Sequence, residues 1–314
     1  MNIISAPASS PPEDLILNHY RSVTPRKAKP LRPINGDVLT SVCHGLGDTM
    51  MLTDIPAAAS KQGRTQNVFS TSQHFLPLMQ FNPYYKDVED KGYLLNAPDL
   101  VRNYDTGNGH YLQRLRRALS LKVDDKPKGF LKWHGQRYKN RVVMHFDAGV
   151  HANWQRMKVH PKARMIYDTT REEIRRFIAE QRDFEFIEIG NNPLNIEGSK
   201  HIITKNTFDL VNTMATGEWF LGIISGPMHV ATALGLRGIV IINFPKPEKI
   251  FLPTVVSCGQ IEEEWFPPQH VFLHQDGEGP LVKRSTFDNI KRAFNGEIYP
   301  FWNDKYLGLI HEKI

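Results

Sequence analysis

The sequence predicts an α/β protein made of two units, each built around a parallel sheet. Short apolar runs rich in β-branched and aromatic residues alternate with segments of helical character. A charged, turn-rich stretch, Val123 to Asn140, separates an earlier set of these elements from a later one. Such alternation implies parallel strands covered by helices on both faces. We therefore expect a binding site in the cleft between the two units.

The expected elements are short and closely spaced along the chain. The expected strands are Val38–Cys43, Gln66–Ser70, Arg141–Phe146, Phe184–Ile189, Trp219–Ile224 and Gly238–Asn243. The expected helices include Asp54–Lys61, Tyr111–Leu119, Thr170–Gln181, Thr207–Thr216 and Met228–Leu234. Each strand candidate is bounded by turn residues, as buried strands of α/β proteins usually are.

The two ends of the chain differ in composition from its middle. Residues 1–33 are rich in proline, serine and basic residues and indicate a loosely packed arm. Residues 34–135 and 136–285 form the two α/β units of this division. Residues 286–314 read as a helix followed by an aromatic-rich tail that needs a surface to pack on.

Composition and charge restrict the class of protein. Of 314 residues, 40% are hydrophobic and 23% charged, which is ordinary globular composition. Two cysteines, Cys43 and Cys258, are too few for a disulfide framework or a zinc site, so we expect a reducing compartment. No apolar run approaches the ~20 residues of a membrane span, and the first residues lack the pattern of a secretory signal. We expect a cytoplasmic protein without stable membrane insertion.

The net charge of +6 comes from 39 Lys and Arg against 33 Asp and Glu. Part of the excess lies in Arg26–Arg32 and in Arg114–Arg141. These runs fit either a solvated face or an anionic partner such as a nucleotide, a phosphorylated glycan, a membrane surface or nucleic acid. Charge by itself does not separate these partners.

One turn carries residues suited to anion binding. "SGPMHVATALG" follows the apolar run "WFLGII" and begins with Ser225 and Gly226. Pro227 suits the first turn of a helix, and Gly226 permits close approach to the backbone. A helix N-terminus there would offer free N–H donors to a phosphate, with His229 in reach. The alternative is a connecting turn with a packed histidine, and spacing by itself leaves both open.

A second glycine turn lies near the start of the first unit. In "CHGLGDTMM", a strand runs into Gly45 and Gly47, and Asp48 stands at a helix start. The glycines permit a tight turn and close ligand approach. Asp48 is either a helix N-cap or a general base for an acceptor hydroxyl, and His44 is a rival base or a structural residue.

A polar loop follows the first strand of the second unit. It carries Asp147, His151, Arg156, Lys158 and His160. The spacing matches no metal motif, so we expect no metal site. Arg156 and Lys158 fit phosphate-neutralising side chains or ordinary surface cations.

In this order, the motifs resemble glycosyltransferase family 9, the heptosyltransferase-like enzymes of GT-B architecture. The quoted segments are "GLGDTMMLTDIPAA", the helix "HYLQRLRRALSL" led by His110, "KVHP", and "NTFDLVNTMATGEWFLGIISGPMHVATALG". The resemblance covers roughly Val38 to Pro253. Ile224 stands where the family has an aspartate, so any donor contact made by that carboxylate is absent or supplied elsewhere.

The resemblance implies two Rossmann-like domains whose parallel sheets face each other across a cleft. A nucleotide-diphosphate sugar would bind mainly to the second domain, without a metal or other cofactor, and the C-terminal helix and tail, residues 286–314, would pack back on the first. It implies Asp48 as general base and His44 and His110 as acceptor-side candidates. The donor-side residues it implies are Gly47, Arg156, Lys158, Ser225, Gly226, Pro227, Met228 and His229.

The acceptor implied by the resemblance is a saccharide, lipid-linked or lipopolysaccharide-type hydroxyl, with an anionic acceptor favoured by the charge. Three alternatives stay open: a modified DNA base, a polypeptide, and a catalytically degenerate protein that only binds nucleotide sugar. Ile224 motivates the last. The sequence leaves the sugar, the nucleotide base and the oligomeric state open.

Overall fold

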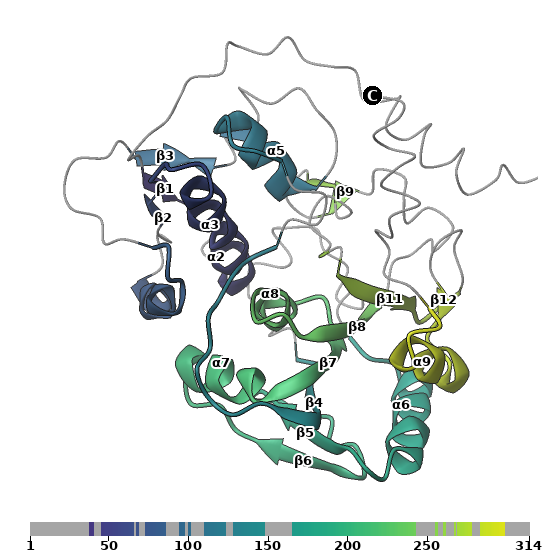
Figure 1. The fold of residues 1–314 in the computed structure, drawn as a ribbon. Coiled ribbons are helices and arrows are strands. Elements are labelled where there is room, and N and C mark those ends of the chain that lie inside the picture. Colours follow the sequence, from purple (N-terminus) through teal and green to yellow (C-terminus); the bar gives the residue numbers. More distant parts are fainter. Residues whose placement is uncertain are drawn as a thin grey trace, which may run out of the picture.

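The computed structural model of the chain contains two parallel sheets, one above the other in Figure 1. It describes residues 38–40, 45–65, 67–68, 73–85, 94–97, 100–101, 110–123, 128–147, 165–242, 255–256, 260–261, 267, 269–277 and 283–298. No helix among these residues is long and apolar enough to cross a bilayer. The arm, residues 1–33, lies outside them.

The N-terminal unit has a three-stranded parallel sheet of order β2-β1-β3. Its elements are β1 (Val38–Thr40), α2 (Leu46–Leu52), α3 (Asp54–Ser60), β2 (Asn67–Val68), the 3-10 helix η1 (Gln73–Phe81), β3 (Leu94–Asn96) and α5 (Tyr111–Ala118). Buried residues such as Leu52, Ile55, Leu100 and Leu115 form its own small core. A buried ion pair between Asp54 and Arg116 ties α3 to α5 inside this unit.

The C-terminal unit has a seven-stranded sheet of order β12-β11-β8-β7-β4-β5-β6, in which every pairing is parallel. The strands are β4 (Tyr138–His145), β5 (Glu185–Ile189), β6 (Ser199–Ile202), β7 (Gly217–Ile223), β8 (Arg237–Ile242), β11 (His270–His274) and β12 (Lys283–Arg284). The helices are α6 (Asp168–Glu180), α7 (Thr207–Ala215), α8 (Gly226–Ala233) and α9 (Phe287–Phe294). A separate antiparallel pair joins β9 (Val255–Val256) to β10 (Gln260–Ile261).

Helices cover both faces of the large sheet, as strand–helix alternation predicts (Figure 1). Successive residues of a strand point to opposite faces. Val143 accordingly packs in the cluster that contains α7 and α8, whereas Val142 packs with α6 and α9. Both faces are therefore closed by apolar contacts, and the strand ends are left as the natural place for a ligand.

The cluster on the α8 face continues into the N-terminal unit. Met50 of α2 and Leu78 and Met79 of η1 are buried in it together with Val230 and Phe272. Helices α2 and α8 pack directly against each other. The units thus share one apolar core at this contact, where the sequence predicted a cleft.

Each of the six expected strands overlaps an observed strand, and each expected helix overlaps an observed helix. Strands β3, β6, β9, β10, β11 and β12 and the 3-10 helix η1 were not predicted. β6 ends the sheet, and its burial pattern shows three exposed residues of four, so its sequence, Ser199–Ile202, lacks the apolar run of a buried strand. The domain boundaries stay a prediction.

The C-terminal helix differs from its expectation. Phe294 of α9 stacks on Trp219 of β7 with ring centroids 4.3 Å apart and meets Phe177 of α6 at 5.2 Å. Its apolar residues thus complete the C-terminal core, and the helix packs on the C-terminal unit instead of the N-terminal one. The tail beyond residue 298, which was expected to cross back, lies outside the described residues.

Candidate functional site

The order of the large sheet locates a candidate site before any side chain is considered. From β4 the chain proceeds to β5 and β6 on one side, then returns to add β7, β8 and β11 on the other. The direction of winding therefore reverses between the neighbours β4 and β7. In open α/β sheets a ligand binds at the carboxyl ends of the strands at such a reversal. His145 ends β4, and Ser225 follows β7 at this point.

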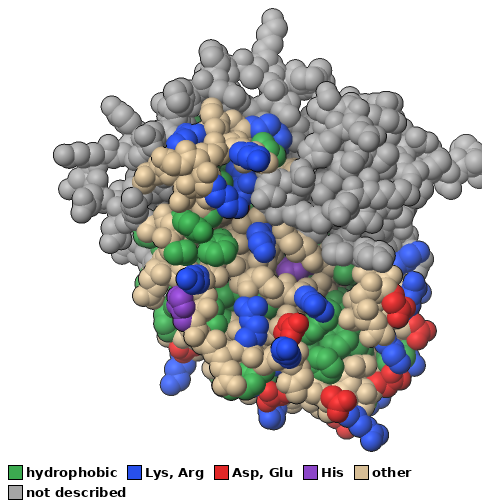
Figure 2. Space-filling model, in the orientation of Figure 1, with side chains coloured by type: hydrophobic (Ala, Val, Ile, Leu, Met, Phe, Trp, Pro, Cys, Tyr) green, Lys and Arg blue, Asp and Glu red, His purple; other side chains and the backbone are tan. Residues whose placement is uncertain are grey.

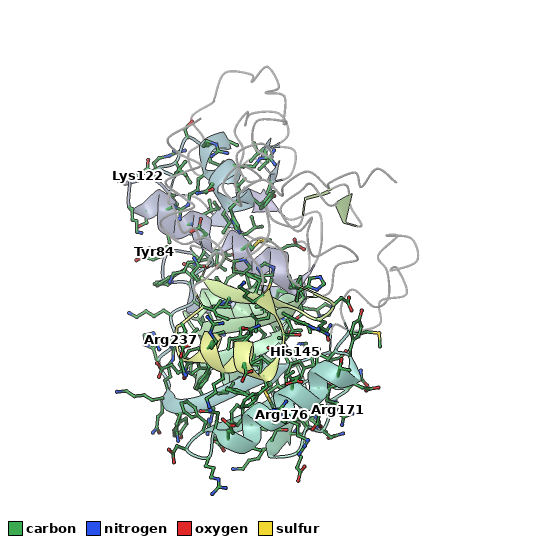
Figure 3. All side chains as sticks on the ribbon, turned by 90° about the vertical axis from the view of Figure 1, so that its right-hand side faces the viewer. Tyr84, Lys122, His145, Arg171, Arg176 and Arg237 are labelled. Atoms are coloured by element: carbon green, nitrogen blue, oxygen red, sulfur yellow. The ribbon has the colours of Figure 1, made fainter. Side chains whose placement is uncertain are left out.

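His145 and Ser225 meet across the reversal. The Nδ1 atom of His145 lies 3.4 Å from the Ser225 hydroxyl, and that hydroxyl donates to the Ile223 carbonyl at 3.2 Å. The serine oxygen is then free to accept from Nδ1–H. Both side chains are buried, and burial lowers the pKa of His145 to about 4, against a smaller opposing effect of Asp147. His145 is therefore neutral at physiological pH. Figure 3 shows it between α6, where Arg171 and Arg176 lie, and the N-terminal unit.

The loop after β5 forms the next wall of this edge. Gly190 has φ +126°, a conformation that favours glycine, and a side chain there would contact the His145 ring. Asn192 donates to the Asp147 carboxylate at 2.9 Å, which joins the end of β4 to this loop. The Glu188 carboxylate accepts from the backbone N–H of Leu194 and Asn195 and fixes the turn. The site is thus shaped by backbone turns and polar contacts at the strand ends.

Helix α8 begins at the reversal with its first turn uncapped by a side chain. Ser225 occupies the N-cap position in extended conformation, but its hydroxyl makes no capping bond. Pro227 lies in the first turn, where a missing N–H costs least, and the Met228 N–H bonds to the Ser225 carbonyl at 3.1 Å. The side chain of Met228 belongs to the core, so any contact it makes with a ligand is through its backbone. The positive end of the helix dipole is consequently directed toward the edge of the sheet.

A hydrogen bond between His270 of β11 and Thr232 of α8 joins the helix to the sheet. The Thr232 hydroxyl donates to the Met228 carbonyl at 3.0 Å and lies 2.9 Å from His270 Nε2. His270 is fully buried, and its Nδ1 has no hydrogen-bond partner within the described part of the chain. Burial lowers the pKa of His270 to about 4, so this ring is also neutral. The helix that begins at the candidate site is therefore fixed to the sheet along its length.

Two glycines allow α2 to approach α8. A Cβ atom placed on Gly47 would lie 2.7 Å from Cδ2 of His229, and one placed on Gly226 would lie 2.9 Å from Cβ of Leu46. Distances below 3 Å between such atoms are repulsive, so each glycine makes room for a side chain of the other helix. The two glycine turns singled out in the sequence are thus in direct contact.

Asp48 and His110 lie next to this contact. Asp48 is half-buried in the first turn of α2, one residue after Gly47. His110 is the buried N-cap of α5, where its Nδ1 accepts from the Leu112 N–H at 3.2 Å and Gln113 completes a capping box. His110 and His229 line one small cavity of about 10 Å³ between the units. This volume is close to the space that one water molecule needs.

Ile224 packs against the apolar cluster shared by the two units, as Leu46 does. A carboxylate at this position would face apolar neighbours at the contact between α2 and the sheet edge. The departure from the family pattern therefore contributes to the joint between the units.

The structure brings Gly47 into contact with His229, and His110 lines the same small cavity as His229. Asp48 follows Gly47 in the first turn of α2, and the stretch Ser225–His229 forms the start of α8. His44, Arg156 and Lys158 lie outside the described residues, and so do His151 and His160. Sequence reasoning missed His145 and Asn192; the signal for the former was a histidine ending the apolar run "VVMHF". Among the residues that the structure describes, no group of three His, Cys, Asp or Glu side chains could hold a metal ion.

Comparison with solved structures agrees with this geometry. A glycosyl transferase of family 9 from Veillonella parvula matches with a TM-score of 0.54 at 13% identity, over 91% of this chain and 100% of that one. The E. coli heptosyltransferase WaaC with ADP matches with a TM-score of 0.51 at 11% identity, over 84% and 99%. The chain has the GT-B fold.

A third GT-B match is the dodecameric, iron-containing glycosyltransferase TibC from enterotoxigenic E. coli, with a TM-score of 0.52 at 16% identity over 90% of this chain and 78% of that one. No family model matches the sequence, and no curated protein matches it by sequence. The structural matches establish the GT-B architecture. Because the sequence identities are only 13%, 11% and 16%, the chemistry has to be argued from the residues.

Because Gly47 contacts His229, we expect the effect of Gly47→Ala on stability to depend on the residue at position 229. Gly47→Ala should lower the free energy of unfolding by about 1–3 kcal/mol, because the new methyl group overpacks against the imidazole. In a His229→Ala background the same change should be neutral, or stabilising by up to about 1 kcal/mol, because alanine is the better helix former. Urea unfolding of the wild type, the two single variants and the double variant measures every free energy in the cycle. Equal effects in both backgrounds would contradict the contact.

The buried histidines predict a pH dependence of stability. The pKa of His145 is about 4 in the folded state and near 6.5 unfolded, so the unfolded chain binds more protons between these values. Stability is complete above pH 6.5 and falls as the pH drops toward 4, by about 3 kcal/mol for this group. His145→Asn, which keeps a donor near Ser225, should flatten the profile of unfolding free energy against pH by up to one proton. An unchanged slope would show that His145 titrates alike in both states.

Proposed function

We propose that the protein is a glycosyltransferase that moves a sugar from a nucleotide-diphosphate donor to a hydroxyl of a saccharide or lipopolysaccharide-type acceptor. The observation that carries the proposal is the uncapped start of α8 at the winding reversal, which contacts the first turn of α2, the turn that contains Asp48. In support, the solved structures of the same fold include a heptosyltransferase with ADP. The residues themselves supply the rest of the argument.

The donor diphosphate is assigned to the first turn of α8. The Gly226 N–H and the dipole of the helix N-terminus stabilise negative charge that develops on a leaving diphosphate. Gly226 lets a phosphate approach the backbone, and Ser225 is held in place by the neutral His145. A neutral imidazole contributes orientation here, not charge. The positive charge would come from Arg156 and Lys158, which follow β4 in the sequence.

Asp48 is the proposed general base. Asp48 belongs to the first turn of α2, and α2 packs on α8, so we assign the base to the N-terminal unit. A carboxylate within hydrogen-bond distance of the acceptor hydroxyl can remove its proton as the hydroxyl attacks the sugar. His110, capping α5 across the small cavity from His229, would position the acceptor side. His44 belongs to the turn that precedes α2 in sequence.

The proposed reaction uses no metal ion. The attacking hydroxyl forms a bond to the anomeric carbon, the bond from that carbon to the diphosphate oxygen breaks, and Asp48 takes the hydroxyl proton. The helix N-terminus and the two cations replace the divalent ion that would otherwise balance the leaving group. Because TibC is an iron-containing member of the same fold, transfer should be assayed with and without a chelator, and we expect it to persist in EDTA.

Asp48→Asn tests the assignment of the base. The amide keeps the size of the side chain but does not accept the proton, so turnover should fall by about 10²–10⁴-fold. Donor affinity should survive, and it is measured as the thermal shift produced by a panel of nucleotide sugars. Asp288→Asn is the matched control, since Asp288 is an exposed carboxylate in the first turn of α9.

Each outcome of this experiment has a distinct meaning. Loss of transfer with retained donor binding in Asp48→Asn, and normal turnover in Asp288→Asn, supports the proposal and excludes a catalytically degenerate binding protein. A panel in which no nucleotide sugar stabilises the wild-type protein would contradict the donor site altogether. Full turnover in Asp48→Asn would refute the base while leaving the transferase reading intact.

A further inference from the structure

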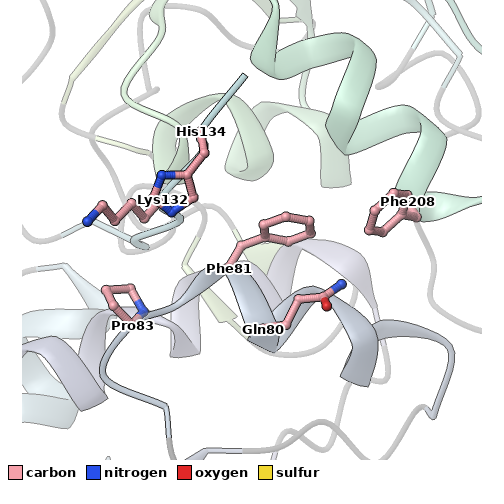
Figure 4. A pocket seen from close by; sticks show the side chains of 6 residues that line it. All are labelled: Gln80, Phe81, Pro83, Lys132, His134 and Phe208. Atoms are coloured by element: carbon pink, nitrogen blue, oxygen red, sulfur yellow. The ribbon is translucent and has the colours of Figure 1, made fainter. Parts of the chain in front are cut away.

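A groove of about 300 Å³ lies where the two units meet, away from the start of α8. The lining residues are Gln80 and Phe81 of η1, Pro83 just after η1, Lys132 and His134 of the segment that leads into β4, and Phe208 in the first turn of α7. Figure 4 shows the Phe81 ring between Phe208 on one side and Lys132 and His134 on the other. In Figure 2, hydrophobic, basic and histidine side chains lie together at the left edge, at the junction of the units.

Aromatic rings form the apolar part of the groove. The centroids of Phe81 and Phe208 are 5.5 Å apart with their planes at 39°, and Trp133 packs against Phe81 at 5.9 Å. Phe208 is 39% exposed, which is unusual for a phenylalanine beside an apolar core. Because the two rings are tilted, they form an open angle and leave no parallel slot for a flat base between them.

The backbone holds this arrangement in place. The Lys132 N–H donates to the Phe81 carbonyl at 2.6 Å, and the Leu131 N–H donates to the Ala233 carbonyl at 2.9 Å. The first bond joins the segment that leads into β4 to η1, and the second joins the same segment to the end of α8. The groove is therefore preformed by elements of both units, as small-molecule sites usually are.

The polar side chains of the groove can receive an anion. Lys132 and His134 are exposed, and neither forms an ion pair with any other described residue. None of the described residues that line the groove is an Asp or a Glu, and the Gln80 amide adds a donor and an acceptor at its rim (Figure 4). A groove lined by both a lysine and aromatic rings suits a ligand that carries both a negative charge and an apolar surface.

We propose that this groove binds an anionic saccharide: a sugar whose C–H face lies on Phe208 and Phe81 and whose phosphate or carboxylate meets Lys132. The inference rests on the proposed function, because it makes the groove a remote subsite for the acceptor glycan. Leu131 is bonded to the C-terminal end of α8, whereas the proposed donor site is at its N-terminal end. Eight residues at 1.5 Å each separate the two by about 12 Å, which a few sugar units span.

The test measures binding directly, without donor or turnover. Glucose 6-phosphate, glucose and inorganic phosphate are titrated separately against the full chain by saturation-transfer NMR, which reports transfer to the sugar C–H protons, and by calorimetry. We expect glucose 6-phosphate to bind at least about tenfold more tightly than glucose or phosphate, because stacking and charge contribute together. Phe208→Ala and Lys132→Gln should each weaken it about five- to tenfold.

Two control variants keep the result specific. Lys283→Gln removes an exposed cation on β12, at the opposite end of the sheet, and Met165→Ala removes an exposed apolar side chain outside the groove. Both should bind glucose 6-phosphate as the wild type does. Unchanged binding in Phe208→Ala and Lys132→Gln, or phosphate binding as tight as glucose 6-phosphate, would overturn the proposal.

The groove and the proposed function fail separately. If nucleotide sugars bind and transfer occurs, but the two groove variants keep the KM of a phosphorylated acceptor, the remote subsite is wrong and the transferase stands. If glucose 6-phosphate binds the groove while no nucleotide sugar binds the protein, the saccharide site stands without the transferase. The thermal stability of each variant, measured in parallel, separates lost binding from lost folding.

Discussion

The contact between α2 and α8 is the constraint on which the other features depend. Each helix has a glycine in its first turn, and each glycine receives a side chain of the other helix: His229 lies against Gly47, and Leu46 lies against Gly226. A Cβ atom at either position would be repelled at this distance, so the sequence at both turns is limited by packing. The same contact joins the turn that contains Asp48 to the uncapped first turn of α8. Packing and the proposed chemistry are thus satisfied by the same few residues.

The large sheet places α8, and with it the contact to α2, at the winding reversal. Apolar clusters on both faces fix the strands, and His270 with Thr232 ties the helix to β11. His145 then occupies the end of the neighbouring strand as a neutral ring that orients Ser225. Both histidines are kept neutral by burial, so neither adds charge at this edge, and among the described residues the positive field comes from the helix N-terminus.

The sequence predicted the elements whose local pattern is strong. "WFLGII" and "GIVIINF" are buried parallel strands, and such runs are recognisable because both faces are covered. The edge strand β6 and the short β3 lack that pattern, and whether such a segment forms a strand depends on the strand it pairs with. The two glycine turns were identified, but their mutual contact was not, because no local rule relates residues nearly 180 positions apart. His145 was missed for a similar reason: its role arises only when β4 and β7 become neighbours. Ile224 was noted as a departure, and the apolar contact that accounts for it is visible only in the folded chain.

The central claim is that a nucleotide-diphosphate sugar binds at the start of α8, and hydrogen exchange of the backbone amides tests it most directly. The amides of the first turn of α8 and of the loops after β4 and β5 should exchange more slowly when a nucleotide sugar is added, because the diphosphate accepts from them and covers them. Peptides from α6 and α9, on the other face of the sheet, serve as the internal reference. Protection confined to peptides outside the winding reversal, with α8 unchanged, would contradict the account.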